Sequence, residues 1–359
     1  MRTGGGLGDP SGTVERGSSA PGAWPGSRAG GRRRATMILV TGGAGYVGSH
    51  YVLHAREAGE EVVVLDDLRR GHREAVGDVS LVVGDVGDRA CLDGIFAAHR
   101  VEAVVHFAAY AYVGESVTEP GLYFRNNVGS TLTLLEAMRD HQVDKIVFSS
   151  SCVVFGNPVR VPIDESHPRE PVSPYGESKL FCERMLAAFD VAHGIRSTPL
   201  RYFNAAGADE GGRTGETHDP ETHLLPLVLQ AATGRQPALR IFGDDWDTPD
   251  GTCVRDYVHV GDLAAAHGLA LQRLRGGAPS RAFNLGSERG HSVREVVAAC
   301  EKVTGKRVET QVTARRAGDP PKLVASAERA RTELGWRPRY TDLERIVATA
   351  WAWEQHRRF

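Results

Sequence analysis

The stretch 173–179 (SPYGESK) carries a tyrosine and a lysine four residues apart. On a helix, residues at this spacing lie on one face, one turn from each other. A phenol normally titrates near pH ~10, and a neighbouring ammonium group favours the phenolate. Tyr175 and Lys179 are therefore a candidate acid–base pair, although ordinary surface helices show the same spacing. The elements around the pair must decide between these two interpretations.

Composition limits the classes of partner. The chain has 359 residues, of which 41% are hydrophobic and 25% charged, as in globular proteins of about two domains. A formal net charge of −2 favours neither nucleic acid nor an anionic membrane as partner. No apolar run reaches the ~20 residues of a membrane span. The five cysteines lack the spacing of metal ligands, so we expect no metal site, reduced thiols and a cytoplasmic protein.

Residues 1–36 differ in composition from the remainder. They are dominated by Gly, Arg, Ser and Pro, and we do not expect them to form a core. They also lack the apolar segment of a signal peptide. Met37 opens directly onto an apolar run, which favours residue 37 as the start of the folded chain and residues 1–36 as a disordered or mis-assigned extension.

From residue 37 onward, β-branched runs alternate with segments of helical periodicity. The strands are expected at 37–41, 61–65, 80–83, 103–107, 145–149 and 196–201, and the helices at 46–58, 89–100, 130–141 and 175–192. Almost continuously apolar strands joined by helices predict a parallel sheet covered on both faces. The fold class is therefore α/β, a Rossmann-like doubly wound sheet that binds ligands at the carboxyl ends of its strands.

The alternation ends near residue 202. The second half shows long loops at 205–220 and 243–252, a strand at 239–242, and helices at 225–233, 260–275, 293–303 and 342–354. We therefore predict a first domain over residues 37–202 and a smaller C-terminal α/β domain over residues 203–359. We expect the two domains to exchange segments.

A glycine-rich turn follows the first strand. Gly42, Gly45 and Gly48 form a G-x-x-G-x-x-G pattern, and Tyr46 and Val47 open the following helix. Such glycines permit a tight turn and let the backbone approach a pyrophosphate at the helix N-terminus. Between a strand and a helix, the pattern predicts a dinucleotide site.

An acidic residue stands where such a site needs one. Asp66 ends the second strand about 20 residues beyond the glycine turn, where a carboxylate can bind the ribose hydroxyls. A carboxylate there repels a 2′-phosphate, which favours NAD over NADP. Arg69 and Arg70 argue the other way, because a guanidinium can hold that phosphate.

Three further strand ends carry small or polar residues. Asp85, followed by Val86, can bind the adenine amine, and Ala108 and Ala109 after Phe107 leave room for a cofactor beside the backbone. Ser149 ends the fifth strand and Ser151 follows it, and the Ser151 hydroxyl lies within reach of the expected nicotinamide end. Because these residues converge on one edge of one sheet, they describe a cofactor groove.

The chain from residue 37 to its C-terminus resembles an extended short-chain dehydrogenase/reductase, and within that superfamily the UDP-glucose (UDP-galactose) 4-epimerase family. The motifs that carry this resemblance are TGGAGYVGSH (41–50), HFAAYAYVGES (106–116), NNVGSTL (126–132), FSSSCVVFG (148–156), SPYGESK (173–179), LRYFNAAG (200–207) and DGTCVRDYVHVGDLAAAH (250–267). They occur in order and at the family's spacing.

The resemblance implies roles for individual residues. Tyr175 is implied to be the catalytic base, Lys179 to assist it and hold the nicotinamide ribose, and Ser151 to assist at the sugar hydroxyl. Asn126 is implied to support the cofactor, and Tyr202 and Phe203 to line its nicotinamide side. The implied contacts to the uracil, ribose and diphosphate of a UDP-sugar are Asn204, Leu224, Phe242, Arg255, Arg316 and Asp319. Arginine forks suit a diphosphate.

The resemblance also implies a reaction. Tyr175 takes the proton of the sugar 4-hydroxyl while hydride passes from C4 to tightly held NAD, the 4-keto sugar turns over, and hydride returns to its other face. A homodimer is implied as well, with contacts between helices around residues 127–141 and 175–192.

Some residues depart from the family's pattern. Val153 and Phe155 stand where Thr and Tyr are frequent, Ala111 replaces a Lys of some members, and Leu323 stands where residue bulk is thought to gate larger sugars. UDP-N-acetylglucosamine and UDP-pentose 4-epimerases therefore stay open as alternatives, as does a catalytically silent NAD-binding module. A 4,6-dehydratase is disfavoured, because Cys152 and Val153 supply no acid pair.

Overall fold

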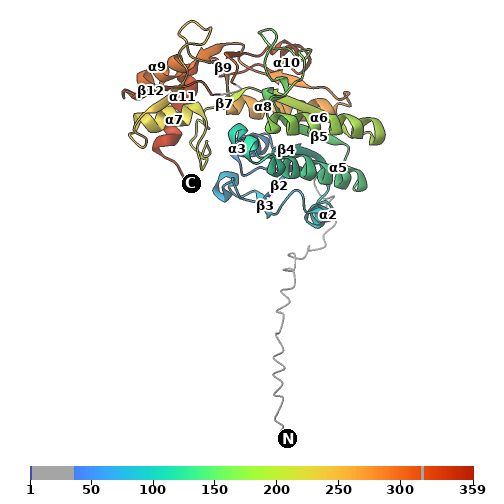
Figure 1. Cartoon of the computed structure of the whole chain (residues 1–359). Helices are drawn as coiled ribbons and strands as arrows, with labels where there is room; N and C mark the ends of the chain where they lie inside the picture. Colours follow the sequence, from blue (N-terminus) through green and yellow to red (C-terminus); the bar gives the residue numbers. More distant parts are fainter. Residues whose placement is uncertain (2–35, 317–318) are drawn as a thin grey trace. The chain divides into compact units, whose positions relative to one another are not determined.

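A seven-stranded parallel sheet is the largest element of the computed structural model, which describes residue 1 and residues 36–316 and 319–359 (Figure 1). Its strand order is β10-β6-β5-β4-β1-β2-β3, so the direction of winding reverses between β1 and β4. The strands are β1 (Met37–Thr41), β2 (Val62–Asp66), β3 (Ser80–Val83), β4 (Val101–His106), β5 (Lys145–Ser151), β6 (Arg196–Tyr202) and β10 (Phe283–Leu285). Ligands of open α/β sheets bind at such a reversal.

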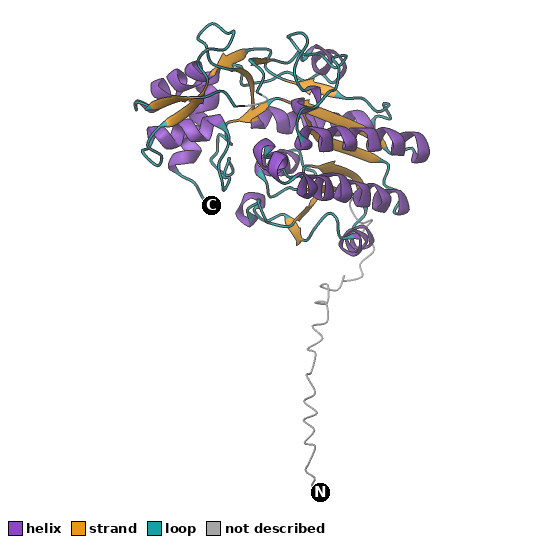
Figure 2. Cartoon of the chain, in the orientation of Figure 1, coloured by secondary structure: helices purple, strands orange, loops and turns teal. Residues whose placement is uncertain are grey.

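Helices cover both faces of this sheet (Figure 2). Helices α1 (Tyr46–Glu57) and α8 (Val260–Arg275) pack on one face, and α2 (Arg89–Ala98), α5 (Ser130–Asp140) and α6 (Pro174–His193) pack on the other. The central strands β1 and β2 are apolar and buried almost throughout, as a sheet covered on both faces requires. The doubly wound α/β fold expected from the sequence is confirmed.

The second half of the chain builds smaller sheets. Strand β9 (Val254–His259) pairs with β7 (Asn204–Ala206), β11 (Gly290–Ser292) and β13 (Lys322–Leu323), and β8 (Leu239–Phe242) pairs with β12 (Thr310–Thr313). Helices α7 (Leu224–Ala232), α9 (Val293–Thr304) and α11 (Leu343–Gln355) enclose a third apolar core beside them. The remaining short helices are η1 (Arg73–Val76), α3 (Val113–Thr118), α4 (Pro120–Tyr123), η2 (Phe124–Gly129), η3 (Cys152–Phe155) and α10 (Glu328–Glu333).

The second half also completes the first sheet. Strand β10 pairs with β6, and α8 packs on the same face as α1, although both elements lie beyond residue 202. The division at residue 202 stays a prediction, and the extension predicted for residues 1–36 falls almost wholly outside the described residues. None of the helices in the described part of the chain is long and apolar enough to cross a membrane.

Helix α6 has clear local signals at both ends. The Ser173 hydroxyl accepts a hydrogen bond from the Gly176 N–H, and Pro174 occupies the first turn, where it costs no hydrogen bond. Gly194 ends the helix in the left-handed conformation. These caps fix where the helix begins, and thereby place Tyr175 in its first turn with Lys179 one turn further on.

Candidate functional site

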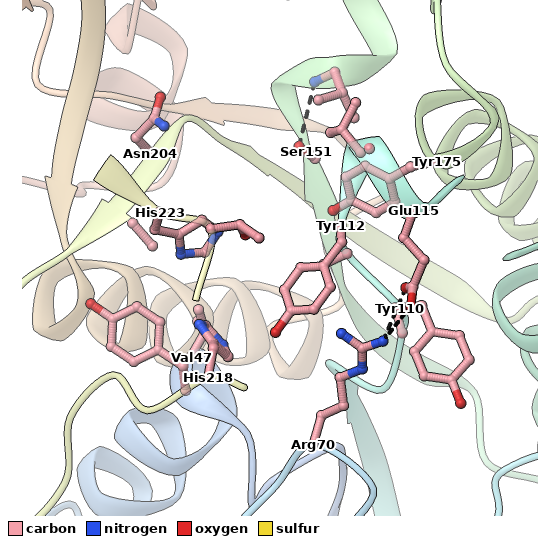
Figure 3. Close-up of a pocket in the computed structure, with 18 of the residues that line it drawn as sticks. Val47, Arg70, Tyr110, Tyr112, Glu115, Ser151, Tyr175, Asn204, His218 and His223 are labelled. Atoms are coloured by element: carbon pink, nitrogen blue, oxygen red, sulfur yellow. Dashed lines mark hydrogen bonds and ion pairs between the residues drawn. The ribbon is translucent and has the colours of Figure 1, made fainter. Parts of the chain in front are cut away.

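A cavity of about 1040 Å³ opens at the carboxyl ends of the sheet strands. Its glycine-loop wall consists of residues at the ends of β1 to β6 and on the loops and helices that follow these strands, and its arginine wall of residues from the second half. Figure 3 shows Ser151 and Tyr175 on one side of the cavity and His218 and His223 across from them. Of the predicted residues, the glycine-loop wall contains Gly42, Gly45, Tyr46, Val47, Gly48, Asp66, Asp85, Val86, Phe107, Ala108, Ala109, Asn126, Ser149, Ser151, Tyr175 and Tyr202, and the arginine wall contains Phe203, Asn204, Leu224, Phe242, Arg255, Arg316, Asp319 and Leu323.

Lys179 is the one predicted site residue that does not line the cavity. Its side chain is buried behind the glycine-loop wall, and its ammonium group donates a 2.8 Å hydrogen bond to the Ser149 carbonyl. The Lys179 Nζ lies 6.0 Å from the centre of the Tyr175 ring. Burial lowers the pKa of Lys179 to about 8. Lys179 thus fixes the end of β5, from which Ser151 projects.

Tyr175 is itself only 8% exposed. Burial, followed by the charge of Tyr202, raises the pKa of Tyr175 well above its ordinary value, and a hydrogen bond with Ser151 acts in the opposite direction. The spacing of the two residues predicted that the Lys179 ammonium would favour the phenolate, but here burial is the larger influence. The arrangement brings a phenol and a serine hydroxyl together in one protected site.

The tyrosine at the end of β6 completes this part of the wall. The hydroxyls of Tyr202 and Ser149 share a hydrogen bond of 2.6 Å. Since β5 and β6 are neighbours in parallel register, Ser149 pairs with Leu200 and Ser151 with Tyr202. Adjacent strands therefore deliver Ser149, Ser151 and Tyr202 to one place.

The glycine turn is closely packed against the sheet. Gly42 has φ +70°, and a Cβ there would lie 2.4 Å from the Ala108 nitrogen. A Cβ on Gly48 would lie 2.1 Å from the Gly42 carbonyl oxygen. Both positions therefore require glycine, one for the turn and one for the approach of α1. At Gly45, which lines the cavity, the nearest atom would lie 3.4 Å away, so packing alone does not require glycine there.

Asp66 links the glycine turn to the end of β2. Its carboxylate accepts hydrogen bonds of 2.9 Å from the Ala44 and Leu68 N–H groups. Burial raises the pKa of Asp66, and these two hydrogen bonds oppose the rise. A carboxylate offers about four acceptor positions, so Asp66 retains capacity for the hydroxyls of a ligand.

The two arginines that argued for a 2′-phosphate are paired with carboxylates. Arg69 lies 3.3 Å from the Asp67 carboxylate and 3.5 Å from that of Asp85. Arg70 donates hydrogen bonds of 2.7 and 3.0 Å to Glu115, as Figure 3 shows. These pairs reduce the positive charge that the two guanidinium groups present to a ligand.

The arginine wall is held by one carboxylate. Asp319 accepts hydrogen bonds of 2.9 and 3.0 Å from Arg316 and lies 3.7 Å from Arg255. Arg255 also donates to the Val254 and Pro320 carbonyls. The Arg316 guanidinium lies 5.5 Å from the centre of the Phe242 ring. Two guanidinium groups and an aromatic ring therefore share one rim of the cavity.

Several residues that shape the cavity were not predicted from the sequence. The Asn127 amide bonds the Tyr110 N–H and carbonyl and the Ser178 hydroxyl, and so ties the loop after β4 to α6. Glu115, the partner of Arg70, also accepts a hydrogen bond from Tyr123. Asn127 lay inside the quoted motif NNVGSTL, so a signal was present. Nothing in the spacing of residues 70 and 115 predicts their contact.

Known proteins share both the sequence and the fold. Residues 38–286 match the NAD dependent epimerase/dehydratase family. The chain is 52% identical over 318 residues to the UDP-glucose 4-epimerase of Halalkalibacterium halodurans, covering 89% of this chain and 95% of that protein. The crystal structure of UDP-glucose 4-epimerase from Brucella ovis in complex with NAD superposes with a TM-score of 0.87 at 48% identity, covering 89% and 98%. The Bifidobacterium longum enzyme in complex with NAD+ and UDP gives a TM-score of 0.85 at 38% identity, covering 90% and 99%.

Proposed function

This chain belongs to the NAD dependent epimerase/dehydratase family, and we propose that it interconverts UDP-galactose and UDP-glucose by inverting C4 of the sugar. The observation that carries the proposal is one cavity that joins the glycine-loop wall, with its buried pair Tyr175 and Ser151, to the arginine wall. One wall has the features of a dinucleotide site, and the other has those of a diphosphate site. The acid–base pair lies where the two ligands would meet.

The glycine-loop wall fits NAD. The close-packed turn, the N-terminus of α1 and the small residues Ala108 and Ala109 leave space for a dinucleotide, and Asp66 can accept hydrogen bonds from its ribose. The pairing of Arg69 and Arg70 with carboxylates favours NAD over NADP. When bound, NAD supplies a reversible acceptor for the hydrogen on C4, so the reaction consumes no net oxidant.

The chain's own residues move the proton. Tyr175 accepts the proton of the 4-hydroxyl and returns it to the same oxygen after the 4-keto sugar has turned over. For this role its pKa must approach the operating pH, and the hydrogen bond with Ser151 acts in that direction. Lys179 positions both groups through its bond to the Ser149 carbonyl. Because both hydroxyls are buried, the proton is protected from exchange with water.

The arginine wall orients the substrate. Arg255 and Arg316 can each form charge-assisted hydrogen bonds with a diphosphate, and Asp319 aligns them beforehand. Leu224 and Phe242 offer apolar surface to the uracil, and the Asn204 amide, which also lines the cavity, can donate a hydrogen bond to the diphosphate. Binding by the nucleotide leaves the hexose free to turn.

Leu323 bears on the choice of sugar. It packs against the apolar cluster that includes Cys152 and Phe203, and it faces the cavity beside Arg255, its partner in the β13–β9 pair. Leucine occupies less volume than tyrosine, so we propose that UDP-N-acetylhexosamines are accepted as second substrates. Purified enzyme assayed with UDP-galactose, UDP-N-acetylgalactosamine and UDP-xylose tests both proposals. Turnover of UDP-galactose is expected, and bound NAD without turnover of any substrate would indicate the silent module.

We further propose a homodimer through α5 and α6, which lie side by side in Figure 1. Four large apolar side chains at these helices and the adjoining η2 are exposed, namely Phe124, Leu132, Phe181 and Val191. The rings of Phe124 and Phe181 also contact each other, with their centres 6.4 Å apart. Phe181→Lys should convert a dimer into a monomer, as measured by light scattering on a sizing column, whereas a monomeric wild type contradicts the proposal.

We propose a cytoplasmic location. None of the five cysteines, all of which are described, forms a disulfide, and four of them are buried. Free thiols persist in reducing compartments. Activity in the cytoplasmic fraction of the source cells is expected, and its recovery outside the cells contradicts this location.

A further inference from the structure

A repeated tripeptide lies in the loop between β7 and α7. Glu216-Thr217-His218 recurs as Glu221-Thr222-His223, five residues further on. The reaction proposed above uses none of its glutamates or histidines. They nevertheless converge, because one ligand atom from each of the four lies within 4.8 Å of the other three.

The two histidines approach the carboxylates from different sides. His218 Nδ1 lies 3.2 Å from Glu216 Oε1 and 3.8 Å from Glu221 Oε1. His223 Nδ1 is hydrogen-bonded to the same Glu216 oxygen. The two imidazole rings are nearly perpendicular, with centres 5.2 Å apart, and Figure 3 shows them next to each other at the cavity wall. Two nitrogens and two carboxylates therefore surround one small volume.

The two carboxylates of the cluster are buried, and two of the cluster's polar atoms lack partners. The side chains of Glu216 and Glu221 are only 6% and 5% exposed. Glu221 Oε1 accepts hydrogen bonds from the Thr222 and His223 N–H groups. Glu221 Oε2 and His218 Nδ1, by contrast, are buried without a hydrogen-bond partner among the described residues. Buried carboxylates are normally paired or bound to metal, and buried polar atoms are normally satisfied.

Protonation of the histidines is the alternative to a metal ion. Burial opposes it, but the neighbouring carboxylates of Glu216 and Glu221 raise the pKa of His218 to about 10. A cluster held by protons alone would place His218 Nδ1 in a hydrogen bond, whereas this nitrogen points between two carboxylates without forming one. A cation bonded to all four groups would satisfy both unpartnered atoms.

We propose that Glu216, His218, Glu221 and His223 bind one divalent transition-metal ion of the zinc class. Two imidazole nitrogens and two carboxylate oxygens are a ligand set that zinc accepts in tetrahedral geometry, whereas magnesium and calcium prefer oxygen ligands alone. Four protein ligands complete that geometry, so the site is structural rather than catalytic.

The position of the cluster indicates what the ion stabilises. The His218 ring makes edge contacts with Tyr46 and Tyr112, with centres 6.1 and 6.0 Å apart. Tyr46 begins α1 and donates a 2.6 Å hydrogen bond to the Gly207 carbonyl at the start of the same loop. The ion therefore fixes residues 216–223, and the His218 ring holds this segment against Tyr46 of the glycine-loop wall, next to Leu224 of the arginine wall.

Metal analysis of the full-length protein tests the site. Enzyme stripped with a chelator and dialysed against Zn²⁺ should retain one zinc ion per chain, as measured by mass spectrometry of the metal. The same treatment with Mg²⁺ should leave no bound magnesium. Zinc should raise the melting temperature of stripped enzyme, because a ligand of the folded state stabilises it.

Matched variants locate the binding. His218→Gln and Glu221→Gln should both lose the bound zinc and the melting shift, while His291→Gln, which alters a partly buried histidine 4.0 Å from Glu295, should keep both. Retained NAD shows whether each variant is folded. If His218→Gln does not fold, Glu221→Gln provides the test of zinc binding. A wild type that binds no zinc, or cluster variants that bind it as the wild type does, overturns the proposal without affecting the epimerase assignment.

Discussion

The two walls of the cavity are built in different ways. On the glycine-loop wall, polar side chains stand at the ends of long buried strands and are bonded to backbone, as Asp66 and the Lys179 behind the wall illustrate. On the arginine wall, the residues lie on short strands and loops, and the Arg316 side chain is 61% exposed. One wall is tied to the backbone of the large sheet by hydrogen bonds, whereas the other is held mainly by Asp319.

This difference suits the reaction. An enzyme that returns the same hydrogen to its substrate must keep its cofactor in place through many cycles, which favours a preformed site. The nucleotide sugar must enter, turn and leave, and an exposed wall permits that exchange. The variants below should therefore affect either cofactor retention or substrate binding, but not both.

The largest effect is expected for Tyr175→Phe. Removing the proton acceptor should lower kcat by about 10²- to 10⁴-fold, the usual contribution of general acid–base catalysis. The residue's pKa is raised, so wild-type kcat should increase as the pH rises, and the variant should lose this dependence. Kinetics with UDP-galactose across a range of pH measure both the fall in kcat and its pH dependence. The amount of bound NAD should be unchanged. A variant of near-normal activity removes Tyr175 from the mechanism.

Arg255→Leu should disturb the arginine wall alone. Loss of a charge-assisted hydrogen bond worth about 1.5–3 kcal/mol should raise KM for UDP-galactose by roughly 10- to 100-fold. The NAD content should stay at the wild-type level. Arg345→Leu is the control, since it breaks an exposed ion pair with Glu210. If Arg255→Leu releases NAD, the two walls are not independent.

The unequal construction also explains what the sequence could predict. The ends of β1 and β2 and the pair Tyr175 and Lys179 follow from local patterns, namely apolar runs, glycine spacing and a capped helix. These features depend on neighbours within a few residues. The fold and the course of the glycine-loop wall were therefore accessible without coordinates.

Contacts between distant segments were not accessible in this way. Arg70 meets Glu115 across 45 residues, and β10 joins the first sheet beside β6 from the other half of the chain. Strands of two or three residues, such as β11 and β13, are too short to show a period. The arginine wall depends on such elements, and its residues were identified only through resemblance to a family.

Leu323→Tyr tests whether one residue of the arginine wall selects between sugars. The larger ring should fill space beside Ser151 and Cys152. It should lower kcat/KM for UDP-N-acetylgalactosamine by at least about 10-fold, because a change in pocket shape typically alters discrimination between substrates by about 1–3 kcal/mol. The value for UDP-galactose should change less. Leu323→Met, of similar volume, is the control. An equal loss on both sugars shows that Leu323 does not select between them.

Asp66→Asn should have the smallest effect, confined to the glycine-loop wall. Replacing a charged acceptor by a neutral one weakens each ribose hydrogen bond by about 1 kcal/mol, so NAD affinity should fall by roughly 5- to 10-fold, while KM for UDP-galactose stays constant. Because burial raises the pKa of Asp66, wild-type enzyme should begin to lose NAD at a higher pH than an ordinary aspartate would imply as the solution is acidified. The Asp66→Asn variant should not show this loss of NAD on acidification. Asp67→Asn, whose carboxylate pairs with Arg69, is the control, and equal NAD loss in the two variants would assign the effect to the charge of the turn instead of to Asp66.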